Sequence, residues 1–114
     1  RLAARIPGAI VPEHVLELVD WVRILKAATL AVGVDSGLTH LAAACEAPTI
    51  AIFRASWAMH LGINGRVPHR NLGDQGREVS IEEAVDAADV LLTGRVFALD
   101  EGAEIADLVT PCRA

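Results

Sequence analysis

The chain has 114 residues, of which 53% are hydrophobic and 22% charged, and its formal net charge is −5. A chain of this length forms one domain at most, and its composition excludes intrinsic disorder. No segment reaches the roughly 18 apolar residues that a membrane-spanning helix needs, and the negative charge opposes binding to nucleic acid. We therefore expect a soluble, folded protein without a nucleic-acid partner.

The first residue and the two cysteines indicate the origin of the chain. It begins at Arg1 without a charged and then apolar leader, so we expect an excised or processed piece that carries no targeting signal. Cys45 and Cys112 have no C-x-x-C spacing, which fits a reducing compartment. We interpret Cys45 as a small buried hydrophobic residue, because nothing marks a base paired with it.

The first part of the chain predicts a helix. Gly8 to Val11 could be the end of a short strand, closed by Pro12. From Glu13 to Ala28 the apolar residues recur every three or four positions, which is typical of an amphipathic helix. They are Val15, Leu18, Val19, Val22 and Leu25.

The middle of the chain predicts a β-α-β unit. Leu30 to Val34 is continuously apolar, as in a strand covered on both faces, and Thr49 to Phe53 is a second such strand. Between them, Thr39 to Cys45 has the alanine content of a helix packed closely on a sheet. The alternation indicates an α/β fold with a Rossmann-like parallel sheet and flanking helices.

The segment from Arg54 to Gly76 has no period, so we expect a long surface loop, with a short strand near Arg70 to Leu72. Its positive or imidazole side chains are by default solvated, and the alternative is that they face a ligand. They are Arg54, His60, Arg66, His69 and Arg70. The spacing of His60 and His69 with Asp74 matches no zinc motif, so no metal site is predicted.

The last predicted element is a helix that begins with a capping box at Ser80 and Glu83 and ends at Gly94. Residues 95–114 fit no single period. We therefore expect one Rossmann-like domain over residues 1–94, itself incomplete, and a C-terminal tail of uncertain structure over residues 95–114.

The turn at Asp35, Ser36 and Gly37 is the candidate site. Ligands of open parallel sheets bind beyond the carboxyl ends of the strands, where Asp35 stands. Ser36 can cap the helix, Gly37 admits a ligand oxygen, and the N–H groups near Leu38 can converge on an anion. These features predict a diphosphate cradle, in which Asp35 accepts hydrogen bonds from a sugar attached to the phosphate.

A structural interpretation of the same residues stays open. Asp35 and Ser36 could merely cap the helix, because short triplets such as D-S-G often mislead. His40 lies on the helix face that points back at the turn, where it could contact a phosphate or hold Asp35 in place. The default interpretation of such a histidine is structural.

The string VGVDSGLTHLAAACEAPTIAIF resembles the C-terminal signature of glycosyltransferase family 9, the ADP-heptose:lipopolysaccharide heptosyltransferases. In that signature V-D-[ST]-G-x-x-H-L-A-A-A precedes a P-T-x-x-x-[FY] strand. The resemblance covers Val19 to Phe53, and the helix from Ser80 to Leu92 resembles the family's closing helix. Where members usually show a G-P-T-like turn after the strand, this chain reads Arg54-Ala55-Ser56-Trp57.

The resemblance implies the C-terminal, donor-binding half of an inverting, metal-independent GT-B enzyme that needs no cofactor. Asp35 would bind heptose hydroxyls of an ADP-heptose-like donor, the backbone of the next three residues would hold the diphosphate, and His40 would line the pocket. The implied donor-binding residues are Asp35, Ser36, Gly37, Leu38, Thr39 and His40. The general base and the acceptor contacts belong to an absent N-terminal domain, so we expect no catalytic residue and no sugar transfer by this chain alone.

The resemblance also implies that the protein is located in the bacterial cytoplasm. The full enzyme would associate peripherally with the inner face of the inner membrane. Its pathway would be the assembly of lipopolysaccharide core or a related glycan. The face left by the absent domain could make the piece self-associate. The alternative hypothesis is a non-catalytic Rossmann-like module that binds a nucleotide or another protein.

Overall fold

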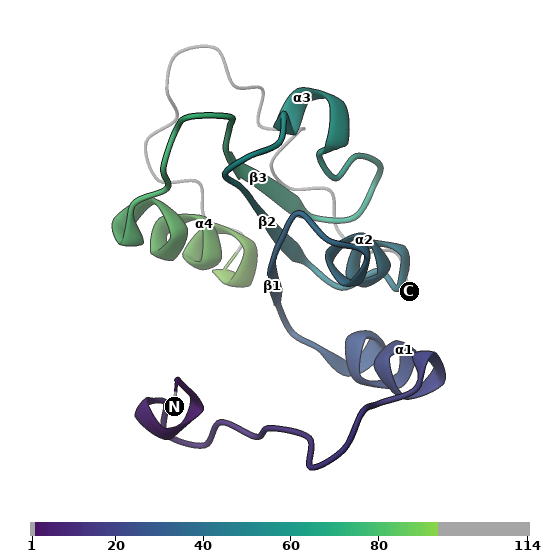
Figure 1. The fold of residues 1–114 in the computed structure, drawn as a ribbon. Helices are drawn as coiled ribbons and strands as arrows, with labels where there is room; N and C mark the ends of the chain where they lie inside the picture. The colour runs from purple at the N-terminus through teal and green to yellow at the C-terminus, as the bar shows by residue number, and fades with distance from the viewer. Residues whose placement is uncertain (1, 94–114) are drawn as a thin grey trace.

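The computed structural model describes residues 2–93, which form a three-stranded parallel sheet with helices on both faces (Figure 1). The strands lie in the order β1 (Ala31–Val34), β2 (Thr49–Phe53) and β3 (His69–Gly73). The helices are α1 (Leu18–Ala27), α2 (Gly37–Ala44), α3 (Ala58–Leu61) and α4 (Ile81–Thr93), after a short 3-10 helix η1 (Ala3–Arg5). This architecture confirms the predicted α/β, Rossmann-like fold.

The central strand β2 forms the core. Successive side chains of a strand point to opposite faces, and both faces of β2 are covered. On one face Ile50 packs with Leu72 and with Ala87 of α4. On the other face Ala51 and Phe53 pack with the α2 and α3 side of the molecule. This double coverage explains why the strand is a continuous apolar run rather than an alternating one.

The predicted β-α-β unit forms with small shifts at its ends. β1 begins one residue later than predicted and β2 has the predicted bounds, and the two pair in parallel with Gly33 opposite Ala51. α2 begins at Gly37 and not at Thr39. It ends in a Schellman motif in which Glu46 adopts a left-handed conformation, with φ of 65°.

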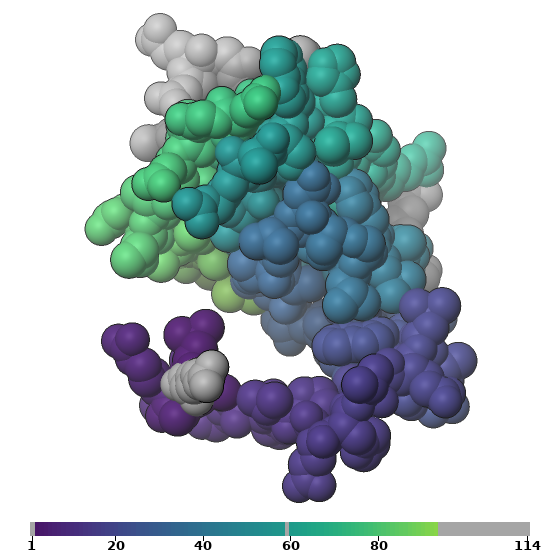
Figure 2. Space-filling model, viewed as in Figure 1, coloured from purple at the N-terminus to yellow at the C-terminus, as the bar shows by residue number. Residues whose placement is uncertain are grey.

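The predicted strand at Gly8 to Val11 does not form. Gly8 has a φ of 77°, and the N–H of Ala9 donates to the carbonyl of Ile6 at 3.1 Å. These residues therefore form a turn, and the described part of the chain offers them no strand partner. In Figure 2 the N-terminal segment, in purple, lies apart from the body that the sheet and α4 form.

Helix α1 is shorter than predicted, because it begins at Leu18 and not at Glu13. The backbone N–H of Glu17 donates to the carboxylate of Asp20 at 3.3 Å, which sets the start of the helix there. Val15 belonged to the predicted apolar stripe but is 95% exposed, since it precedes the helix.

The segment from Arg54 to Gly76, predicted as a long surface loop with a short strand near Arg70 to Leu72, holds more regular structure than that. It contains α3 and β3, and β3 includes the predicted short strand and pairs in parallel with β2 along its whole length. The side chain of Asn71 binds both the N–H and the carbonyl of Ile63, each at 2.8 Å. This pair of bonds ties the connecting segment to the edge strand.

Helix α4 begins after Ser80, as the sequence predicts. The N–H of Glu83 donates to Ser80 Oγ at 3.0 Å, but the Glu83 carboxylate turns to Arg77, so only half of the capping box forms. The predicted helix end at Gly94 and the tail with Cys112 lie outside the described residues. None of the helices between residues 2 and 93 has the length and apolar content to cross a bilayer.

Candidate functional site

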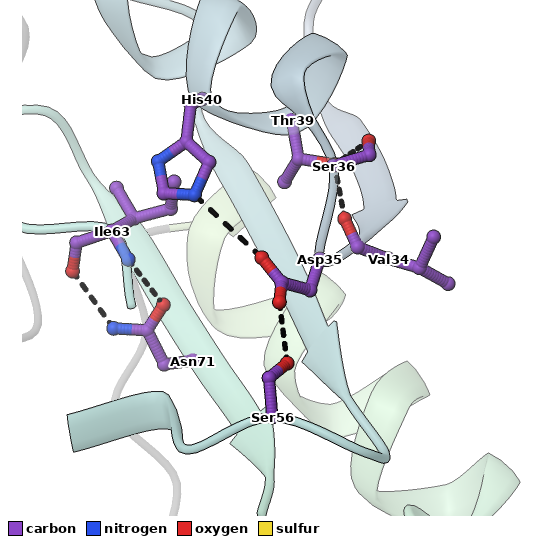
Figure 3. A network of polar contacts seen from close by, with 8 residues as sticks. All are labelled: Val34, Asp35, Ser36, Thr39, His40, Ser56, Ile63 and Asn71. Carbon is purple, nitrogen blue, oxygen red and sulfur yellow. Dashed lines mark hydrogen bonds and ion pairs between the residues drawn. The ribbon is translucent and has the colours of Figure 1, made fainter. Parts of the chain in front are cut away.

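The carboxyl ends of β1 and β2 meet at one edge of the sheet and bring Asp35 and Ser56 together (Figure 3). Ser56 Oγ donates a hydrogen bond to Asp35 Oδ2. On the other side of the same carboxylate, His40 Nε2 lies 3.9 Å from Asp35 Oδ1. The Asp35 side chain thus has a neighbour on each oxygen and still remains 31% exposed.

A buried threonine holds the turn that leads from β1 into α2. Thr39 is only 5% exposed, and its Oγ1 donates to the carbonyl of Val34 at 2.6 Å. Gly33 makes this close approach fit, since a Cβ there would overlap Thr39 Oγ1 and lie 3.3 Å from Thr39 Cβ. Thr39 therefore shapes the turn from inside, with its side chain away from solvent.

Ser36 precedes α2 but does not cap it with its side chain, contrary to the sequence interpretation. Its hydroxyl lies 3.2 Å from Thr39 Oγ1 instead. The Ser36 carbonyl accepts the N–H groups of Thr39 at 3.2 Å and His40 at 3.3 Å. The Ser36 hydroxyl thus contacts the buried Thr39, and no side-chain oxygen caps the first amides of α2.

The first two N–H groups of α2 are those of Gly37 and Leu38, and neither has a hydrogen-bond partner among residues 2–93. A Cβ placed on Gly37 would meet no heavy atom within 4 Å. Residues 35 to 38 are all exposed. The positive end of the helix dipole and two unused donors therefore border open space, which is the arrangement that attracts anions.

The sequence that forms this site was compared with known protein families, curated proteins and solved structures. Residues 9–75, more than half of the chain, match the family described as glycosyltransferase family 9 (heptosyltransferase). The chain belongs to glycosyltransferase family 9. No curated protein and no solved structure matches it.

The matched region of this family 9 chain runs from before α1 to the end of β3, so it contains the whole candidate site. The site combines two kinds of group. The open amides at the start of α2 can donate to an anion, and the Asp35 carboxylate can accept from hydroxyl groups. A sugar linked to a phosphate carries both complementary groups.

Three of the basic and imidazole side chains in the segment after β2 make contacts elsewhere. Arg54 pairs with Glu78 at 3.3 Å, His69 Nδ1 lies 2.7 Å from the carbonyl of Val67, and the His60 ring lies 5.8 Å from that of Trp57. These contacts do not involve Asp35. Within residues 2–93, no three His, Cys, Asp or Glu side chains group in a way that could hold a metal ion.

Ser56 is the site residue that sequence reasoning missed. It lies 21 residues after Asp35, in a stretch interpreted as loop, so no local pattern links the two. The signal was in the topology, because adjacent parallel strands end at the same edge of a sheet and the residues after them become neighbours. The polar side chains within a few residues of the end of each predicted strand were the place to look.

Proposed function

We propose that the turn from Asp35 to His40 binds the nucleotide-sugar donor of a glycosyltransferase. The observation that carries the proposal is the pair of unpartnered amides at Gly37 and Leu38, which border open space beside the exposed Asp35 carboxylate. Family 9 membership supports a nucleotide sugar as the ligand, and an ADP-heptose-like donor is the specific candidate.

In this proposal the diphosphate binds at the N-terminus of α2. The N–H groups of Gly37 and Leu38 donate to its oxygens, and the helix dipole adds a favourable field. Glycine at this position lets the oxygens come close to the backbone, since no side chain stands in front of the amide. The same groups stabilise the charge of the departing nucleoside diphosphate during transfer.

The sugar lies toward Asp35. A carboxylate repels a phosphate but is a strong acceptor for hydroxyl groups, so Asp35 separates the two ends of the donor. His40 lies 3.9 Å from one carboxylate oxygen and is 47% exposed, so it borders the same space. Thr39 contributes by its bond to the Val34 carbonyl, which fixes the turn between strand and helix.

The proposal extends to the setting of the reaction. The general base and the acceptor site would come from an N-terminal domain, and the complete enzyme would build lipopolysaccharide core or a related glycan at the inner face of the bacterial inner membrane. The chain on its own should then bind the donor without transferring the sugar, and turnover by the purified chain would contradict this part of the proposal.

Calorimetric titration with ADP and with ADP-heptose tests the two halves separately. Gly37→Val should weaken both ligands about a hundredfold or more, because its side chain blocks two hydrogen bonds to a charged group. Asp35→Ala should leave the diphosphate contacts in place. It should lower the ratio of the affinities for ADP-heptose and ADP about tenfold, since only the sugar contact is lost.

Ser80→Ala is the matched control, because Ser80 precedes α4 and lies outside the site. It should bind both ligands like the wild type. Binding by the wild type that none of the site substitutions changes would contradict the proposed site. Binding of ADP without any preference for the sugar-bearing ligand would favour the non-catalytic nucleotide-binding module instead.

A further inference from the structure

Ser56 is a second residue that contacts Asp35 from outside the turn after β1. It lies in the connection between β2 and α3, Arg54-Ala55-Ser56-Trp57. Its hydroxyl points at the Asp35 carboxylate, as Figure 3 shows, and donates to Oδ2. The residue itself is half-buried between the ends of the two strands.

The contact decides how the Asp35 carboxylate is oriented. The terminal torsion of an aspartate is broad, so a partly exposed carboxylate without a partner rotates freely. His40 lies 3.9 Å from Oδ1, which is too far for a direct hydrogen bond. Ser56 is therefore the residue, among those described, that holds the plane of this carboxylate through a hydrogen bond.

The bond from Ser56 also leaves acceptor capacity at the site. A carboxylate has about four lone-pair positions, and Ser56 occupies one of them on Oδ2. The serine hydroxyl has a single proton, which it gives to Asp35, so its own lone pairs remain for a further donor. The pair can thus accept hydrogen bonds from more than one hydroxyl group of a sugar.

We propose that Ser56 is a positioning residue that orients Asp35 toward the sugar of the donor and thereby sets the preference for the sugar-bearing ligand. The inference rests on the proposed donor site. It goes further because it assigns sugar selectivity to the connection between β2 and α3 as well as to the turn after β1. The hydroxyl is the group that matters, so threonine should replace serine and alanine should not.

The test is titration of the full chain with ADP and with ADP-heptose for the wild type, Ser56→Ala and Ser56→Thr. Ser56→Ala should lower the preference for ADP-heptose by about threefold to tenfold, the effect of losing one hydrogen bond to a charged group. Its affinity for ADP should fall far less. Ser56→Thr should restore the preference, and thermal melting should show all three proteins folded.

The outcomes separate the two proposals. A wild type that binds neither ligand overturns the donor site and this inference with it. A wild type that prefers ADP-heptose, with Ser56→Ala keeping the full preference, overturns the role of Ser56 alone. Two further results also overturn it: an equal loss of preference in Ser56→Ala and Ser56→Thr, or an equal loss of affinity for ADP and for ADP-heptose in Ser56→Ala. Either result would mean that damage to the connection between β2 and α3, and not the missing hydroxyl, is the cause.

Discussion

Two helices of this chain begin after a serine, and the two serines do different things. At α4, Ser80 Oγ accepts the N–H of Glu83 at 3.0 Å and closes the start of the helix. At α2, the Ser36 hydroxyl lies against Thr39 Oγ1, and the amides of Gly37 and Leu38 have no partner within residues 2–93. At α4, too, the first two amides, those of Ile81 and Glu82, have no partner within residues 2–93, so the two starts differ at the third amide, which only at α4 receives the serine side-chain oxygen.

The difference separates a structural helix start from one available to a ligand. The first turn of α4 carries the carboxylates of Glu82 and Glu83, which repel an anion, whereas the first turn of α2 carries no acidic residue and borders open space, so an anion gains hydrogen bonds there. A serine before a helix is therefore not a sufficient signal for either role. The partner of its hydroxyl decides, and at α2 that partner is the buried Thr39.

The largest expected effect comes from breaking the packing that creates the open start. Gly33→Ala introduces a Cβ that overlaps Thr39 Oγ1, which is held by its bond to the Val34 carbonyl. The free energy of unfolding should fall by about 1–3 kcal/mol, as measured by chemical denaturation. In the double variant Gly33→Ala, Thr39→Ala the overlap with Oγ1 disappears and only the contact with Thr39 Cβ at 3.3 Å remains, so the two losses should be clearly less than additive. Additive losses would contradict the packing.

The next effect sharpens the contrast between the two serines. Ser80→Ala should lower the free energy of unfolding by about 1 kcal/mol, because a helix cap is lost. Ser36→Ala removes only a hydroxyl pair with Thr39, so its cost should stay below about 0.5 kcal/mol. Denaturation of the two variants side by side gives the comparison. A larger loss in Ser36→Ala than in Ser80→Ala would show that Ser36 caps α2 after all.

The smallest effect concerns pH and belongs to α4 alone. Hydrogen bonds from Arg77 lower the pKa of the Glu83 carboxyl, against a smaller opposing effect of burial. The stabilisation is present above the unfolded-state pKa of about 4.3 and is lost as the pH falls through the lower folded-state value. Glu83→Gln should flatten this part of the stability profile in acid. An unchanged profile would mean that the Arg77 pair contributes nothing measurable.

The apolar elements of the fold were predictable because burial leaves a local pattern. Thr49 to Phe53 is buried on both faces and reads as a continuous apolar strand, with the bounds that the structure has. β3 was predicted only over its middle residues, Arg70 to Leu72, since only Leu72 of its five residues is buried and the sequence HRNLG has no strand period. Pairing with β2 holds it extended, and that pairing joins residues about twenty positions apart.

In the candidate site, too, some residues could be predicted from the sequence and others could not. The residues from Asp35 to His40 are contiguous and follow a strong strand, so their convergence could be predicted from the order of elements. The use of the Ser36 hydroxyl could not, because it depends on how deeply Thr39 packs against Gly33. Ser56 could not either, because its contact with Asp35 comes from the neighbouring strand end.

Binding of a diphosphate by the open amides of α2 can be followed residue by residue with amide NMR during titration with ADP. The amide resonances of Gly37 and Leu38 should shift until saturation, while that of Glu83 at the capped start of α4 should stay unchanged. Saturating ADP that leaves the Gly37 and Leu38 resonances in place, or shifts Glu83 equally, would contradict diphosphate binding at α2.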